Sequence, residues 1–207
     1  MKKYYHGTAK HGPYFEGWYL KLQTPKYKSL ALIPAVHIDS TKQHHTSLQV
    51  ITEEETRWLE YPYTQFHASE DRFQVQLAEN VFSQNGVRLN VDQNGLSISG
   101  MVRFGPLTPL KSDIMGPFRF ISRMECSHGV ISMGHSLEGT LLMNGEKIDF
   151  GGGMGYVETD RGCSFPNVYL WTQCIWKEAQ YNSLMLSVAT IPLAVGQFTG
   201  CICAILH

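Results

Sequence analysis

The chain has 207 residues, with 17 basic and 18 acidic side chains and a formal net charge of −1. Because the two signs are balanced, the composition argues against a nucleic-acid groove or an anionic membrane surface as the partner. The five cysteines include no CxxC pair, and the first residues contain no apolar segment of the secretory type. We therefore expect reduced thiols and a cytoplasmic location.

Two apolar stretches near the N-terminus predict β-strands, Phe15–Leu22 and Ser29–Ile38. In the first, alternation places Glu16 on the same face as Trp18 and two leucines. Burial of a carboxyl group favours its protonated form, so Glu16 is a candidate general acid. The alternative is that Glu16 lies at the end of the strand and reaches water or a lysine.

Clean two-residue alternation begins at Phe73, and three Asn-Gly pairs interrupt it, at residues 85–86, 94–95 and 144–145. Asn-Gly favours tight hairpin turns, so this region predicts antiparallel meanders. We find no amphipathic helix of usual length and expect an all-β chain. Many short, apolar strands favour a barrel or strongly curved sheet around an apolar cavity. The proline-rich segment Phe104–Phe118 is the predicted long loop, either a linker or a flap over that cavity.

The C-terminal part carries no Asp, Glu, Lys or Arg after Glu178. Polar, proline and glycine residues interrupt this run, so it predicts two buried strands, Ser183–Ile191 and Phe198–Leu206, and no membrane span. A turn is expected near Val195. The chain stops in the middle of the last strand, which suggests a fragment of a longer protein. Peripheral membrane contact and a homodimer both remain open.

The stretch from Gly151 to Cys174 carries the strongest chemical signal. Glu158 and Asp160 share a face if their segment is extended, and Val168–Trp176 reads as a strand buried on both sides. Two carboxylates beside an apolar strand suggest acid–base chemistry. The alternative is an ordinary turn in which Arg161 makes a local ion pair. Walker A, GxGxxG and HExxH motifs are absent, so we expect neither a bound cofactor nor a metal site.

Two blocks of sequence together resemble the tocopherol cyclase family. One is Phe15-Glu16-Gly17-Trp18-Tyr19, and the other combines Tyr156-x-Glu158, Gly162-x-Ser164-Phe165-Pro166 and Trp171-x-Gln173-Cys174. The resemblance implies a divergent, bacterial-type member, similar to carotenoid hydratase-like proteins with two lipocalin-like (calycin-like) antiparallel β-barrel halves. Residues 1–118 would form the first half. Residues 119–207 would carry the acidic motif and the start of an incomplete second half.

The same resemblance implies closure of a chromanol ring on a prenylated hydroquinone, without a redox cofactor. Glu158 would donate the proton to the alkene, Asp160 would be its partner or the base, and Glu16 is the alternative acid. The expected substrate-binding residues are Trp18, Tyr19, Tyr156, Arg161, Phe165, Trp171 and Gln173. Asp160 and Arg161 depart from the plant pattern, which leaves the substrate open. The competing functions are a lipocalin-like binding protein for a hydrophobic small molecule and a structural β-domain.

Overall fold

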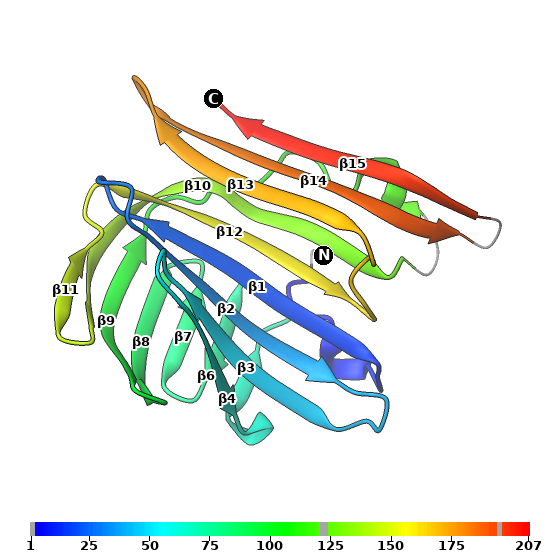
Figure 1. The fold of residues 1–207 in the computed structure, drawn as a ribbon, viewed down its shortest axis with the longest axis horizontal. Helices are drawn as coiled ribbons and strands as arrows, with labels where there is room; N and C mark the ends of the chain where they lie inside the picture. Colours follow the sequence, from blue (N-terminus) through cyan, green and yellow to red (C-terminus); the bar gives the residue numbers. More distant parts are fainter. Residues whose placement is uncertain (1–2, 121–123, 194–195) are drawn as a thin grey trace.

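The computed structural model describes residues 3–120, 124–193 and 196–207, and these fold into an all-β, antiparallel protein (Figure 1). Helical structure in these ranges is limited to three 3₁₀ turns, η1 (Gly7–Ala9), η2 (Tyr63–Gln65) and η3 (Gly116–Phe120), and none could cross a membrane. The strands are β1 (Tyr14–Gln23), β2 (Ser29–Ile38), β3 (His44–Ile51), β4 (Thr56–Tyr61), β5 (Phe66–Ala68), β6 (Gln74–Leu77), β7 (Asn80–Ser83), β8 (Gly86–Gln93), β9 (Leu96–Phe104), β10 (Cys126–Met143), β11 (Glu146–Asp149), β12 (Gly153–Gly162), β13 (Tyr169–Lys177), β14 (Tyr181–Leu193) and β15 (Gly196–Leu206).

Twelve strands form a large curved sheet in the order β4-β3-β2-β1-β12-β10-β9-β8-β7-β6-β5, with β11 paired to β10. Its main core gathers apolar side chains from strands along the whole sheet, including Trp18, Leu20 and Val157. We call the face that bears these residues the core face. Between the described edge strands β4 and β5 there is no ladder, so of the two expected forms, a barrel or a strongly curved sheet, the structure has the curved, open sheet.

The predicted hairpins are confirmed at their Asn-Gly turns. Asn94 and Asn144 both adopt positive φ angles, 53° and 49°, and the glycine after each does the same. These turns join β8 to β9 and β10 to β11. The ladder continues across residue 118, because β10 and β12 pair within the same sheet as β1 and β9. The two-domain division stays a prediction.

Strands β13, β14 and β15 form a separate three-stranded sheet that packs against the opposite face of the large sheet (Figure 1). We call this opposite face the cavity face. A second core, which includes Tyr156 and Met185, lies between the two sheets. Hydrogen bonds between described residues also connect the two layers: the Tyr181 hydroxyl donates to the carbonyl of Gly152, just before β12, at 2.8 Å, and Gln23 Nε2 donates to the Ile175 carbonyl at 3.3 Å. Both predicted C-terminal strands are present, and the turn expected near Val195 falls on residues outside the described ranges.

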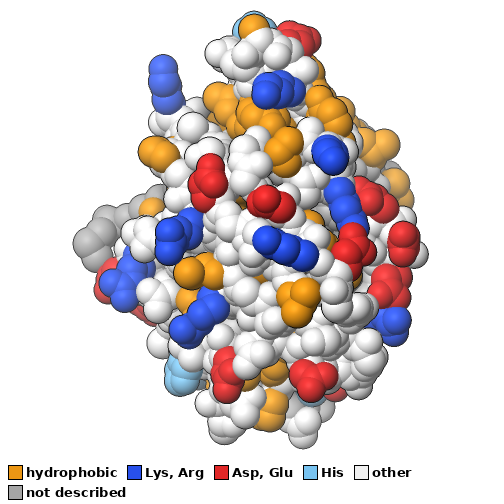
Figure 2. Space-filling model, turned by 90° about the vertical axis from the view of Figure 1, so that its left-hand side faces the viewer, with side chains coloured by type: hydrophobic (Ala, Val, Ile, Leu, Met, Phe, Trp, Pro, Cys, Tyr) orange, Lys and Arg blue, Asp and Glu red, His pale blue; other side chains and the backbone are white. Residues whose placement is uncertain are grey.

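One prediction about the small sheet is wrong. The segment 168–176 was expected to be buried on both faces, but Val168 and Leu170 are 67% and 57% exposed. Ile205 of β15 is also exposed. Figure 2 shows apolar side chains gathered in the upper part of the molecule, where this sheet lies, and charged side chains spread over the large sheet below. Among the described residues, the face of this sheet toward the large sheet is covered, and apolar side chains of the other face are exposed.

Candidate functional site

A cavity of about 510 Å³ lies between the cavity face of the large sheet and the small sheet. Its wall is mainly apolar and aromatic, with Phe15 and Tyr19 from β1 and Tyr169 and Trp171 from β13. The rings form packed pairs: Tyr19 and Trp171 meet edge to face with centroids 5.0 Å apart. The proline-rich segment before β10 contributes Met115 and Phe118 to the wall. Such a lining suits a hydrophobic small molecule.

The alternation of β12 decides which side chains reach this cavity. Val157 points into the main core, so Tyr156, Glu158 and Asp160 point to the cavity face. Glu158 is 2% exposed, and it lies at the wall together with Asp160. Alternation along β12 therefore places both carboxyl groups on its cavity side, while its other side packs into the hydrophobic core.

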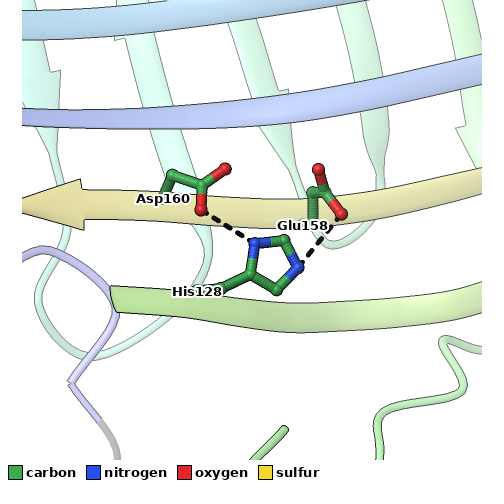
Figure 3. Close-up of side chains that lie close together, drawn as sticks. All are labelled: His128, Glu158 and Asp160. Atoms are coloured by element: carbon green, nitrogen blue, oxygen red, sulfur yellow. Dashed lines mark hydrogen bonds and ion pairs between the residues drawn. The ribbon is translucent and has the colours of Figure 1, made fainter. Parts of the chain in front are cut away.

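His128 of β10 lies between the two carboxyl groups (Figure 3). Its Nδ1 is 2.8 Å from Asp160 Oδ1, and its Nε2 is 3.2 Å from Glu158 Oε2. Because His128 pairs with Asp160 across the β10–β12 ladder, its side chain emerges on the same face. We call His128, Glu158 and Asp160 the carboxylate–imidazole cluster.

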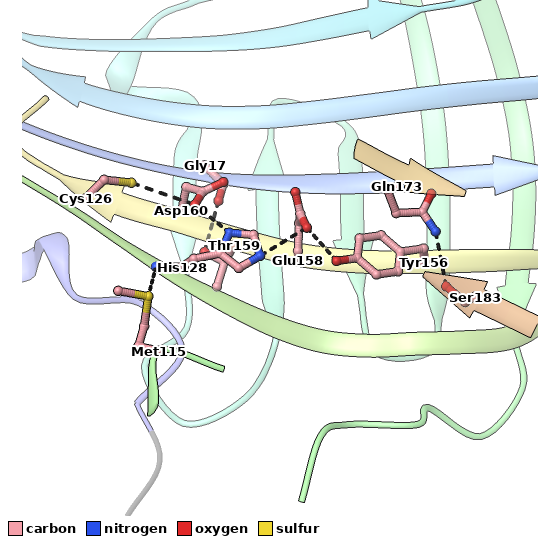
Figure 4. A network of polar contacts seen from close by, with 10 residues as sticks. All are labelled: Gly17, Met115, Cys126, His128, Tyr156, Glu158, Thr159, Asp160, Gln173 and Ser183. Atoms are coloured by element: carbon pink, nitrogen blue, oxygen red, sulfur yellow. Dashed lines mark hydrogen bonds and ion pairs between the residues drawn. The ribbon is translucent and has the colours of Figure 1, made fainter. Parts of the chain in front are cut away.

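Neighbouring groups hold this cluster in place (Figure 4). The Tyr156 hydroxyl donates a 2.5 Å hydrogen bond to Glu158 Oε2. Cys126 Sγ lies 3.8 Å from Asp160 Oδ1, and the Met115 sulfur accepts the His128 backbone N–H. Each member of the cluster therefore has a fixed neighbour besides the other two.

The imidazole ring of the cluster favours its doubly protonated, cationic form. Burial opposes the charged ring, but hydrogen bonds to Asp160 and Glu158 outweigh it and raise the pKa of His128 to about 10. Burial also raises the pKa of Glu158, against the hydrogen bonds from His128 and Tyr156. With the imidazolium beside Asp160, Glu158 is the carboxyl group best placed to take the next proton.

The cluster also has donors that a metal ion could use. One ligand atom from each of its three members lies within 4.8 Å of the others. However, both ring nitrogens already lie close to a carboxylate oxygen: Nδ1 in a hydrogen bond with Asp160, and Nε2 in an ion pair with Glu158. A cation would have to displace the imidazolium proton before His128 could bind it.

The structure brings only some of the expected site residues together. Tyr19, Phe165 and Trp171 line the cavity with Glu158 and Asp160, and Tyr156 supports Glu158 without lining it. Gln173 lies in the small sheet, where its Nε2 donates to Ser183 Oγ at 3.2 Å. Trp18 belongs to the main core, so it lies on the far face of β1.

Glu16 and Arg161 also lie on the core face, opposite to Glu158. They pair across the β1–β12 ladder, and Glu16 alternates with cavity-facing Gly17. Glu16 is fully buried and accepts hydrogen bonds from the His6 backbone N–H at 2.8 Å and the Tyr14 hydroxyl at 2.7 Å. Its partners tie the N-terminal segment to the sheet, which points to a structural role.

Sequence reasoning missed His128. The segment Met124–Gly129 carries no motif, and its distance from Glu158 along the chain is large. The pairing of β10 with β12 brings the ring to the carboxyl groups. The register of this pairing is irregular between Val130 and His135, so simple alternation along the sequence does not show which side chains of β10 face the cavity. No signal in the sequence could have found this residue.

Comparison with known proteins supports the fold. The chain matches no family model and no curated protein. It is similar to a crystal structure from Nitrosomonas europaea provisionally described as AttH, with 13% identity and a TM-score of 0.51 over 90% of this chain and 67% of that one. It is also similar to kievitone hydratase from Nectria haematococca, with 10% identity and a TM-score of 0.51 over 98% of this chain and 68% of that one. These likenesses support a lipocalin-like, antiparallel β fold.

Proposed function

We propose that this protein catalyses acid-initiated addition of an O–H group across an alkene of a hydrophobic, isoprenoid-type substrate. The observation that carries the proposal is a buried, protonatable carboxyl group, Glu158, held by His128 and Tyr156 at the wall of an apolar cavity. Protonation of an alkene needs a carboxylic acid kept neutral in an apolar site. The surrounding rings can stabilise the carbocation that forms.

The reaction divides into two proton transfers. Glu158 donates its proton to one alkene carbon, the π electrons form the new C–H bond, and the other carbon becomes a cation. An oxygen nucleophile then attacks the cation and loses its proton to Asp160. Because His128 contacts both carboxyl groups, it passes a proton back to Glu158 and restores the acid. No electrons are gained or lost overall, so the cycle needs no redox partner.

The nucleophile defines two forms of this reaction. A phenol oxygen of the same molecule gives the tocopherol cyclase-like ring closure of a prenylated hydroquinone, which is an isomerisation. A water molecule gives hydration, the reaction class named for the similar kievitone hydratase. The cavity alone would also suit a lipocalin-like protein that binds a hydrophobic small molecule without chemistry.

The test is incubation of the folded protein with a panel of prenylated hydroquinones, followed by chromatography and mass spectrometry. Cyclisation changes retention at constant mass, whereas hydration adds the mass of one water. Glu158→Gln should lower turnover at least about 100-fold, the usual contribution of a general acid. Glu16→Gln is the matched control, because Glu16 is equally buried in the same sheet but lies on the other face.

Each result separates the hypotheses. Turnover lost in Glu158→Gln and kept per folded molecule in Glu16→Gln supports the proposal. The reverse pattern would move the acid to the core face and reject this site. Unchanged substrate that co-elutes with the protein would favour the binding function.

A further inference from the structure

A second polar position lies on the cavity face, three strands away from Asp160. Ser47 of β3 lines the cavity and is 3% exposed. Its Oγ has no hydrogen-bond partner among the described residues. Buried polar groups in folded proteins are almost always paired. The unpaired hydroxyl of Ser47 in the cavity wall is therefore a group that an oxygen of a ligand could pair with.

The ladders place Ser47 in one row with the carboxylate–imidazole cluster. Asp160 pairs with Gly17, Gly17 with Ala35, and Ala35 with Ser47. Neighbouring strands are about 4.8 Å apart, so three intervals separate Asp160 from Ser47 by about 14 Å. All four residues line the cavity. The row therefore runs along the cavity wall from an acidic end to a hydroxyl end.

The two middle residues of the row have small side chains, so they leave space in the cavity above the sheet. Gly17 has no side chain and Ala35 has only a methyl group, and we call this pair the Gly17–Ala35 floor. A Cβ added at Gly17 would meet the Ala35 Cβ at 3.5 Å, which is an ordinary contact. Close backbone packing therefore does not require glycine at this position. Its effect is to keep space above the floor open between Phe15 and His37 on one side and Tyr19 on the other.

The chemistry around Ser47 is neutral. His37 and Gln49 line the same end of the cavity, and burial lowers the pKa of His37, which favours its uncharged ring. Neither lysine nor arginine occurs among the described residues of the lining. A carboxylate or phosphate would have no cation to pair with here. The matching ligand group is a neutral oxygen, such as a hydroxyl, phenol or carbonyl.

We infer that Ser47 anchors the substrate, its hydroxyl hydrogen-bonding a neutral oxygen of an elongated ligand that lies along the Gly17–Ala35 floor. This deepens the proposed function, on which it rests for the chemistry at the acidic end. Subtracting a hydrogen-bond length at each end of the 14 Å row leaves about 8 Å. That is the span of one aromatic ring with a short branch. A prenylated phenol with a second oxygen far from the alkene fits the row.

The experiment measures binding without chemistry. Isothermal titration uses a 2-alkylhydroquinone and the matching 2-alkylphenol, whose saturated chains contain no alkene to protonate. Ser47→Ala should lower the affinity for the hydroquinone analogue about fivefold to tenfold, which is the effect of one hydrogen bond. The affinity for the phenol analogue should not change. Ser47→Thr keeps a hydroxyl and should restore affinity to within about twofold. Gly17→Leu fills the floor and should weaken both analogues more than about tenfold.

Controls and outcomes keep the two proposals apart. Ser99→Ala makes the same chemical change on an exposed strand position and should alter neither affinity. The anchoring role of Ser47 would be overturned by any of three results. Ser47→Ala could lower the affinity for both analogues equally, it could leave both affinities unchanged, or the folded wild-type protein could bind neither analogue. Selective loss without turnover of unsaturated hydroquinones would support the anchor and reject the proposed reaction.

Discussion

At the scale of single residues, the acidity of Glu158 is set by groups around it. The Tyr156 hydroxyl donates to its carboxyl group, which lowers the pKa of Glu158, while burial raises it. Removal of that hydroxyl in Tyr156→Phe should raise the pKa of Glu158 further. Under the proposed reaction, the acid must be protonated, so the alkaline limb of the kcat profile should move up by about 0.5 to 1 pH unit.

Rates measured across pH with a saturating substrate would check this shift. Tyr19→Phe is a suitable control, because Tyr19 also lines the cavity, whereas among the described residues the tyrosine hydroxyl that bonds Glu158 is that of Tyr156. A limb that stays in place, or moves to lower pH, would contradict the role given to Tyr156.

Single residues also show which features of the site could be predicted from the sequence pattern. The shared face of Glu158 and Asp160 follows from a period of two and could be predicted. The role of Glu16 could not, because β1 is apolar on both faces and the pattern does not say which face meets the cavity. His128 and Ser47 enter through pairing between strands, which no local pattern records.

At the scale of elements, Glu16 joins the N-terminal segment to β1. The carboxyl group is fully buried and has partners from His6 and Tyr14. Glu16→Gln replaces one carboxyl oxygen with an NH₂ donor, so the amide cannot satisfy all of these donors. We expect the free energy of unfolding to fall by about 1–3 kcal/mol. Denaturant titration would measure this loss, and an unchanged midpoint would argue against the anchoring role.

The small sheet depends on the second core for its position. Met185 of β14 is fully buried there, next to Ile175 and Tyr156. Met185→Ala should therefore cost about 2–5 kcal/mol, because it removes buried apolar contacts and leaves a cavity. It should also weaken ligand binding, since β13 supplies part of the wall. Thermal unfolding with and without an alkylhydroquinone would check both effects; a loss below about 1 kcal/mol would mean that the small sheet is held by other contacts.

Elements with local signals were predictable. Asn94-Gly95 and Asn144-Gly145 encode turns through their own backbone preferences, so both hairpins were found. The exposed outer face of β13 was not found. Leu170 and Val168 look like core residues because the sequence records apolar character, whereas exposure depends on what packs over the strand.

At the scale of the whole molecule, the cluster links folding to pH. The pKa of His128 is raised to about 10, so its contribution to stability is fully present below its unfolded pKa near 6.5 and is lost as pH rises through 10. The raised pKa of Glu158 acts with the same sign. We expect the free energy of unfolding to fall by at least about 1.4 kcal/mol between pH 6.5 and 10, the equivalent of one pKa unit.

Denaturant unfolding at a series of pH values would measure this fall. In His128→Gln, the part of this fall in unfolding free energy that comes from the imidazole should disappear. The smaller pH dependence that comes from titrating surface groups should remain. A wild-type curve that rises over this range, or a variant with the same slope, would show that the ring is not charged in the folded protein.

Strand β12 serves two compartments at once, with Val157 in the main core and Glu158 in the cavity wall. This double use restricts how the gene can change. Deletion or insertion of one codon just before Glu158 would exchange the two faces, so that carboxyl groups would enter the hydrophobic core and valine would face the substrate. Length variation among descendants of this chain should therefore collect in the hairpin turns and spare β12.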